Sequence, residues 1–161
     1  MACIVNREPE IVIQEVEVEK IVEIEKEVIV EVEPTYVYNI TPEEREMLAR
    51  LVFLEGNLDS LECQKAIVST VMNRLDNGYW GDNLHDVIYS YQQFTPANQI
   101  KTTTPNNTNY EAVDYVLRYG STLPSYVLYF RSKYHFNWEG YEPYGVIGGT
   151  YFGYFIKDKL W

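Results

Sequence analysis

Cysteine and positive charge are scarce in this chain of 161 residues. It has two cysteines, Cys3 and Cys63, and 13 basic residues against 24 acidic ones, which gives a net charge of −11. Two cysteines are too few for a disulfide framework or a cysteine-based zinc site. Because the chain is acidic and its basic residues are scattered, phosphate backbones would repel it. Nucleic acid is therefore not an expected partner.

Long apolar runs and metal-ligand patterns are also missing. Glutamates interrupt the apolar stretches well before the roughly 20 residues that a membrane-spanning helix needs, so we expect no membrane insertion. The first residues show no basic segment followed by an apolar one, and we expect no secretory signal peptide. His85 and His135 have no carboxylates at metal-ligand spacing. We therefore expect neither a metal nor a cofactor.

Aromatic residues are absent from the first fifth of the chain. All 15 tyrosines, six phenylalanines and three tryptophans follow Pro34, whereas residues 1–33 hold ten glutamates and three basic residues. The first segment therefore has no large side chains with which to build a core. We predict a Glu/Val-rich extended segment over residues 1–34 and a folded domain over residues 35–161.

The Glu/Val-rich segment alternates between two kinds of residue. From Val16 to Glu33, β-branched residues occupy most even positions and glutamates most odd ones, although Ile21 and Ile29 interrupt the pattern. A hydrophobic period of two residues predicts a strand with one solvent-exposed face. A helical heptad register is the alternative, but it places glutamates at the seam. Because a lone strand cannot bury its apolar face, residues 11–33 would pair with copies of themselves, attach the domain to a virion or another protein, or remain a spacer.

Two long helices are predicted at the start of the domain. Thr41-Pro42-Glu43-Glu44 combines a capping threonine, a proline at the first helical position and a glutamate three residues after the cap. This predicts a helix from Pro42 to about Glu55 that stops at Gly56. Asp59-Ser60-Leu61-Glu62 opens a second helix that ends at Asp76-Asn77-Gly78, and its broad apolar face marks it as the central core helix.

The remainder of the domain is predicted to contain shorter elements. Helices fit residues 83–89 and 110–119, and the polar stretch 95–109 is predicted to be a loop. Strands are predicted at 127–130 and 150–155, with a turn region rich in glycine and aromatic residues between them. The predicted fold is therefore α+β, with a mainly helical core followed by a small β region.

Glu55 does not match its surroundings. It follows three apolar residues of the first helix at spacings of three and four, namely Leu48, Leu51 and Val52. Burial would raise its pKa from about 4.3 towards about 6, where a carboxyl group can donate a proton near neutral pH. A general acid in glycoside cleavage needs this property. Spacing alone favours a side chain that turns into solvent beyond Gly56 or pairs with Arg74.

Four short motifs carry a family resemblance. In chain order they are the run from Leu48 to Glu55, Gln64-x-Ala66-x-Val68 leading to Asn73-Arg74, Val87-Ile88 followed by Gln93-Phe94-Thr95, and Leu128-Tyr129-Phe130. Their order and separations resemble those of the spore-cortex-lytic-enzyme family of cell wall hydrolases. The resemblance implies a lysozyme-like fold and cleavage of peptidoglycan glycan strands, often as a lytic transglycosylase. It places Glu55 at the position of the family's acid and base.

The resemblance also implies substrate-binding residues. Gln93 matches the family glutamine that would orient an N-acetyl group, although Gln92 stands where the family has glycine, and capping of a preceding helix is an alternative role for Gln93. We further expect substrate contacts from Thr95, Tyr129 and Tyr151. Most of the other aromatic residues near the C-terminus are expected in the core.

Three residues near the predicted site raise further expectations. Thr150 stands where the family usually has a histidine, which puts a supporting role of that position in doubt. Asn73 and Arg74 are expected to buttress the end of the Glu55 helix through hydrogen bonds. Four possible second acids show no motif that would place them beside Glu55: Asp59, Asp82, Asp86 and Asp114.

The scarcity of partnered acids favours the transglycosylase route, in which the muramic acid supplies its own 6-hydroxyl group and one glutamate suffices. Hydrolysis by water is a weaker alternative. A non-catalytic wall-binding or virion structural module with an oligomerising stalk is a rival of another class. Without a signal peptide, we expect a phage or prophage lysin that is made in the host cytoplasm and released to the cell wall, or one that is carried on the virion.

We predict that a chain starting at Tyr36 folds on its own, because every aromatic residue and every helix signal lies after Pro34. Thermal unfolding should be cooperative, and aggregation or a broad transition would contradict the prediction. Light scattering of the full chain should give an oligomer if the alternating strand pairs with itself. If the full chain is a monomer, residues 11–33 are instead a spacer or attach the domain to another protein.

Overall fold

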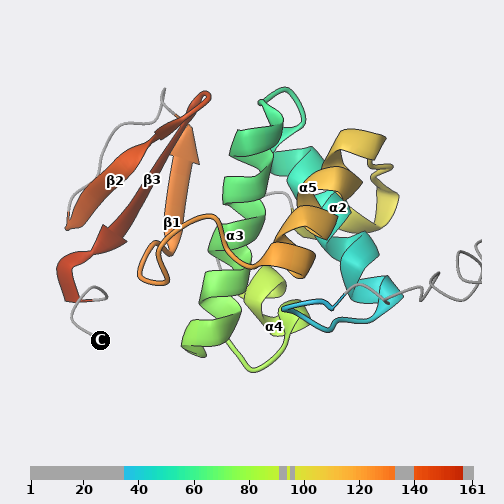
Figure 1. Ribbon diagram of the computed structural model, residues 1–161, viewed down its shortest axis with the longest axis horizontal. Coiled ribbons are helices and arrows are strands. Elements are labelled where there is room, and N and C mark those ends of the chain that lie inside the picture. The colour runs from blue at the N-terminus through green and yellow to red at the C-terminus, as the bar shows by residue number, and fades with distance from the viewer. Residues whose placement is uncertain (1–34, 91–93, 95–96, 133–139, 158–161) are drawn as a thin grey trace, which may run out of the picture. The chain divides into compact units, whose positions relative to one another are not determined.

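The computed structural model describes residues 35–90, 94, 97–132 and 140–157 (Figure 1). The predicted Glu/Val-rich segment lies outside the described residues. The helices are α2 (Pro42–Gly56), α3 (Leu61–Asn77), α4 (Leu84–Tyr89) and α5 (Asn107–Tyr119), with a 3-10 helix, η1 (Ala97–Thr102). The strands are β1 (Tyr129–Ser132), β2 (Tyr141–Ile147) and β3 (Thr150–Phe155). The predicted α+β class is confirmed.

The two long helices begin and end where the sequence predicts. Thr41 Oγ1 accepts a hydrogen bond from the Glu44 amide (3.2 Å), and the Glu44 carboxylate accepts one from the Thr41 amide (2.8 Å). The side chain of Ser60 likewise caps α3 by accepting from the Cys63 amide. Gly78 ends α3 with φ of 75°, a conformation that glycine adopts without strain.

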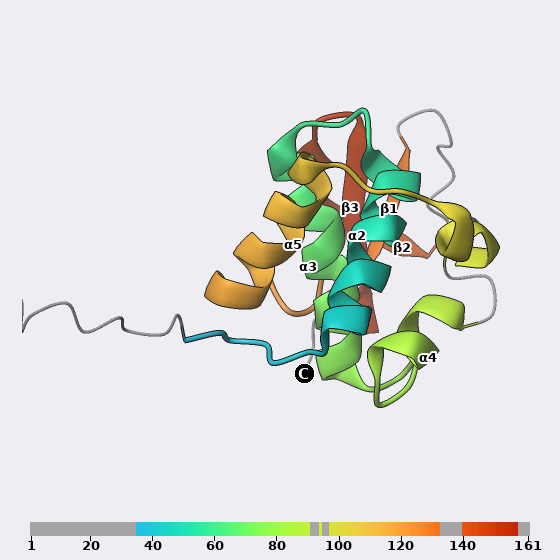
Figure 2. The same ribbon diagram turned by 90° about the vertical axis from the view of Figure 1, so that its right-hand side faces the viewer.

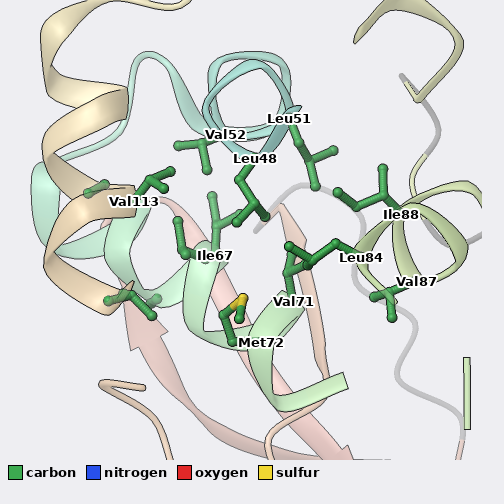
Figure 3. Packing of buried hydrophobic residues seen from close by; sticks show 14 of the residues in the cluster. Leu48, Leu51, Val52, Ile67, Val71, Met72, Leu84, Val87, Ile88 and Val113 are labelled. Carbon is green, nitrogen blue, oxygen red and sulfur yellow. The ribbon is translucent and has the colours of Figure 1, made fainter. Parts of the chain in front are cut away.

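Helix α3 is the centre of the domain. In Figures 1 and 2 it stands between the three-stranded sheet on one side and α2 and α5 on the other. Every residue from Cys63 to Arg74 is buried, which explains the broad apolar face in the sequence. Figure 3 shows its side chains packed with those of α2, α4 and α5; the labelled residues are Leu48, Leu51, Val52, Ile67, Val71, Met72, Leu84, Val87, Ile88 and Val113.

The sheet is antiparallel with strand order β1-β3-β2. Phe130 of β1 lies opposite Phe152 of β3, and the Phe152 side chain is fully buried. The prediction for 127–130 is wrong by two residues, because Val127 and Leu128 are buried before the strand begins. The prediction of a turn region missed β2, an edge strand whose residues are half-buried or exposed and lack an apolar alternation.

The predicted loop over residues 95–109 is also wrong in part, since it contains η1 and the first turn of α5. Helix α5 begins three residues earlier than predicted. Asn106 accepts hydrogen bonds from the Thr108 and Asn109 amides, and the Asn109 side chain accepts one from the Asn106 amide. Asparagine thus supplies the reciprocal cap that glutamate or glutamine usually provides. None of the helices described here has the length and hydropathy to cross a membrane.

Gly56 allows the last turn of α2 to approach α3 closely. A Cβ atom at this position would lie 2.5 Å from Cδ1 of the buried Ile67. We predict that Gly56→Ala lowers the free energy of unfolding by about 1–3 kcal/mol, because Ile67 has little room to shift. Urea unfolding measures the change. Gly145→Ala is the matched control, since a Cβ there meets nothing within 4 Å and stability should be almost unchanged; equal losses in both variants would contradict the packing argument.

Candidate active site

The carboxyl group of Glu55 lies in the last turn of α2 and is largely withdrawn from solvent. Burial raises its pKa to about 7, and the positive charge of Arg74 partly opposes this rise. Among the described residues, no ion pair within 4 Å joins Glu55 to Arg74. Of the alternatives that spacing left open, the structure therefore favours the buried carboxyl group, which can be protonated near neutral pH.

Arg74 is the charged group that influences Glu55, and it is itself only 3% exposed. Its Nε donates to the backbone carbonyl of Leu128 (2.7 Å), whereas its buried Nη1 atom has no hydrogen-bond partner among the residues that the structure describes. Burial lowers the arginine pKa to about 10, and Glu55 acts against this shift. Cζ of the guanidinium group lies 4.8–5.6 Å from the centroids of three aromatic rings, those of Trp80, Phe94 and Tyr129.

The predicted buttressing of the Glu55 helix by Asn73 and Arg74 is wrong. The Asn73 side-chain amide donates to the carbonyls of Pro124 (2.8 Å) and Val127 (3.1 Å), just as Arg74 donates to that of Leu128. Both side chains therefore hold the segment before β1 against the C-terminal half of α3. This segment offers three backbone carbonyls that the short strand β1 does not use, and buried carbonyls need donors.

A chain of neutral amides supports the turn after Glu55 instead. Gln64 Nε2 donates to the Asp59 carbonyl (3.1 Å), and Gln64 Oε1 accepts from the Asn109 side chain (2.9 Å). Asn106 donates to Asn57 Oδ1 (2.6 Å) on the same turn. Gln64 and Asn109 are almost completely buried. Their 45-residue separation gives no local sequence signal, which is why the amide pair was not predicted.

Thr150, at the position where a histidine was expected, packs the sheet against α3. It is 5% exposed, and its hydroxyl group lowers the pKa of the buried Cys63 thiol against the effect of burial. The β2–β3 turn approaches the same point, since a Cβ at Gly148 would lie 3.2 Å from Cys63 Cβ. Burial raises the pKa of the Cys63 thiol to about 11. The thiol therefore stays protonated and is not a nucleophile.

The predicted substrate-binding residues are only partly described. Gln93 and Thr95 lie outside the described residues, but Phe94 between them is buried and lies against Arg74. Tyr129 also contacts Arg74 and is thus close to the candidate acid's electrostatic partner. Tyr151 lies on β3 opposite Arg131 of β1. It is two residues along β3 from Gly153, which lies opposite Tyr129. The structure thus brings Tyr129 and the centre of the Gln93–Thr95 motif together at Arg74.

The four other candidate acids are engaged elsewhere or exposed. Asp114 pairs with Arg45, Asp86 lies at the start of α4, and Asp59 acts on the Cys63 thiol, whose pKa it raises. Asp82 is exposed. Within the described ranges no carboxylate contributes to the Glu55 pKa, and no three metal-ligating side chains gather at one point. The site therefore consists of one half-buried acid whose pKa is influenced by one buried cation.

Comparisons with known proteins identify a matching family and similar folds. Residues 59–153 match the profile of a protein family described as Cell Wall Hydrolase. The catalytic domain of the germination-specific lytic transglycosylase SleB from Bacillus anthracis is similar in structure, with 22% identity and a TM-score of 0.64, over 71% of this chain and 97% of that one. The catalytic domain of the Bacillus cereus SleB protein gives 20% identity and a TM-score of 0.65, over 71% and 92%. Curated protein sequences give no significant match.

The raised pKa of Glu55 predicts a pH-dependent stability. The folded chain binds this proton with a pKa of about 7 and the unfolded chain with one near 4.5, so stability falls as pH rises from about 4.5 to about 7. Glu55→Gln should therefore be more stable than the parent at pH 8, by on the order of 2 kcal/mol, and similar to it at pH 4.5. Urea unfolding at several pH values measures the difference.

Glu111→Gln is the control for this comparison, because Glu111 is an exposed glutamate on α5. It should show no such pH-dependent gain. A Glu55→Gln difference that stays constant from pH 4.5 to pH 8 would mean that Glu55 does not titrate in this window.

Proposed function

This chain belongs to the cell wall hydrolase family, and we propose that it cleaves the glycan strands of peptidoglycan with Glu55 as its single general acid and base. The observation that carries the proposal is the half-buried Glu55 carboxyl group in the last turn of α2, whose pKa burial raises to about 7. The profile match begins at Asp59, so the assignment of Glu55 rests on its own environment and on the motif that contains it. The shared fold of the SleB catalytic domains supports the same reading.

In the first step, protonated Glu55 gives its proton to the glycosidic oxygen. The bond between this oxygen and C1 of the muramic acid then breaks, and positive charge develops at C1 and the ring oxygen. A glycosidic oxygen leaves poorly without a proton, which is why the acid must be protonated near neutral pH. The raised pKa of Glu55 meets this requirement.

In the second step, the 6-hydroxyl group of the same muramic acid attacks C1, and the Glu55 carboxylate takes the proton of that hydroxyl. The product is a 1,6-anhydro sugar, and Glu55 is protonated again for the next cycle. Because the nucleophile comes from the substrate, no second carboxylate is needed, in keeping with the finding that no other described carboxylate contributes to the Glu55 pKa. Attack by water would give a product heavier by one water, so product mass distinguishes the two reactions.

Arg74 would act between the two steps. Once Glu55 has given up its proton, its carboxylate is a negative charge in a place poor in solvent. The buried guanidinium group of Arg74 then lowers the free energy of that charged form, as its effect on the Glu55 pKa shows. Arg74 is in this view a positioning and electrostatic residue, because it acts on substrate only through Glu55.

We also propose that residues 11–33 attach the enzyme to a second copy or to another protein, such as a virion component. The alternating β-branched residues and glutamates support this proposal, because such a strand has an apolar face that it cannot bury alone. The light-scattering comparison with a chain starting at Tyr36 tests it.

The proposed role of Glu55 predicts that Glu55→Gln lowers turnover by about 10²–10⁴-fold, since the amide keeps the shape of the side chain but has no proton to transfer. Release of soluble fragments from labelled peptidoglycan measures turnover, and mass spectrometry identifies the 1,6-anhydro product. Binding to intact walls should persist, because it does not need the carboxyl proton.

Glu111→Gln again serves as the control and should retain full turnover. A folded Glu55→Gln chain that still cleaves peptidoglycan at the parent rate would rule out the assigned role. A parent chain that binds walls without releasing any fragment would favour the rival non-catalytic module.

A further inference from the structure

A cleft of about 500 Å³ opens beside the C-terminal end of α3, outside the group formed by Glu55 and Arg74. It lies between the turn that follows α3 and the strands β1 and β3. Four aromatic rings and two polar side chains line it, namely Tyr79, Trp80, Tyr129, Phe155, Asn77 and Lys157. The reaction proposed above requires only Glu55, Arg74 and the substrate, so this cleft has no role in the chemical step.

The aromatic rings form one connected wall. The Tyr79 and Trp80 centroids are 5.1 Å apart, those of Trp80 and Tyr129 5.8 Å, and those of Tyr129 and Phe155 5.0 Å. Each pair meets edge to face. Trp80 is almost buried, whereas Tyr79 is 80% exposed. An exposed ring held against a buried one offers a fixed platform, and such a platform suits the apolar face of a sugar.

Polar groups at the cleft point to a particular kind of sugar unit. Lys157 is the only charged residue among the described ones that line it, and its Nζ lies 5.1 Å from the Phe155 ring centroid. In a chain with a net charge of −11, a cation at an aromatic cleft favours an anionic group on the ligand. Asn77, at the exposed end of α3, adds an amide that can bond to a hydroxyl or an N-acetyl group.

The cleft shares a wall with the Glu55 site. Trp80 and Tyr129 line the cleft, and their rings also lie 5.0 Å and 5.6 Å from the Arg74 guanidinium carbon. Arg74 in turn influences the Glu55 carboxyl group. The cleft and the Glu55 carboxyl group are therefore linked through Arg74.

We propose that this cleft is a remote subsite that binds a carboxylate-bearing sugar unit of the same glycan strand. The sugar ring stacks on Tyr79, and its carboxylate lies near the Lys157 ammonium group. The proposal rests on the function proposed above. The carboxylate belongs either to a stem peptide or to the lactyl group of a muramic acid that has lost its stem, and the two sources share the same recognition chemistry.

The test uses the full chain carrying Glu55→Gln, so that the strand is bound and not cleaved. Uncrosslinked peptidoglycan strands with their stem peptides are titrated into it, and affinity is measured by calorimetry. Adding Tyr79→Ala should weaken binding about tenfold, which corresponds to ~1.4 kcal/mol, and Tyr79→Phe should stay within twofold of the parent. Tyr119→Ala is the matched control, because this tyrosine is 62% exposed on α5 away from the cleft.

A second arm examines the charge. Lys157→Gln should weaken binding of the strands severalfold at low salt but leave binding of an uncharged N-acetylglucosamine hexamer unchanged. Strands treated with an amidase keep only the lactyl carboxylate. If Lys157→Gln still weakens their binding, that carboxylate is the partner of Lys157; if it weakens only untreated strands, the stem peptide is.

Kinetic measurements distinguish a failure of the proposed subsite from a failure of the proposed cleavage reaction. In chains that retain Glu55, Tyr79→Ala should raise KM for long strands by about tenfold, with a smaller change in kcat. A parent chain that cleaves peptidoglycan while Tyr79→Ala and Tyr119→Ala bind and react alike would overturn the subsite but not the reaction. A parent chain that cleaves nothing, yet loses strand binding with Tyr79→Ala, would overturn the reaction and support the subsite.

Discussion

The burial of one guanidinium group determines how the parts of this domain meet. Arg74 projects from the central helix, donates to the carbonyl of Leu128 before β1, and lies among rings from three different segments. These contacts join helices and sheet at the place where the chain holds its buried carboxyl group. The guanidinium charge also limits how far burial raises the pKa of Glu55. A single side chain thus links packing to the chemistry of the site.

Local physical rules made much of the helical part predictable. The caps at Thr41 and Ser60 fix the starts of α2 and α3, and the glycines at 56 and 78 mark their ends. Glu55 was identified because a carboxylate at the end of an apolar stripe is out of place on a helix face. The family resemblance that rested on four short motifs is confirmed by the profile match over residues 59–153 and by the shared fold.

The remainder depends on contacts between distant parts of the chain, which have no local pattern. Among the described strands, β2 pairs with β3 alone, and its half-buried or exposed residues show no apolar alternation. A bulge between Pro143 and Gly145 also breaks its register. The pairing of Gln64 with Asn109 and the contact of Arg74 with Phe94 each arise only after folding. Asn73 and Arg74 were recognised as important, but their acceptors are backbone carbonyls, which every residue carries. The sequence therefore identified these two hydrogen-bond donors but not the carbonyl groups that accept from them.

The amide chain from Asn57 to Asn109 has a consequence for the setting in which the protein works. Bacterial walls are ionic materials in which local salt and acidity vary, and ion pairs at protein surfaces weaken when salt rises. The groups that fix the turn after Glu55 are uncharged: two side-chain amide pairs and one backbone carbonyl. Neither salt nor a change of a few pH units alters them. The carboxyl group of Glu55 therefore follows a turn whose supporting side-chain contacts do not titrate.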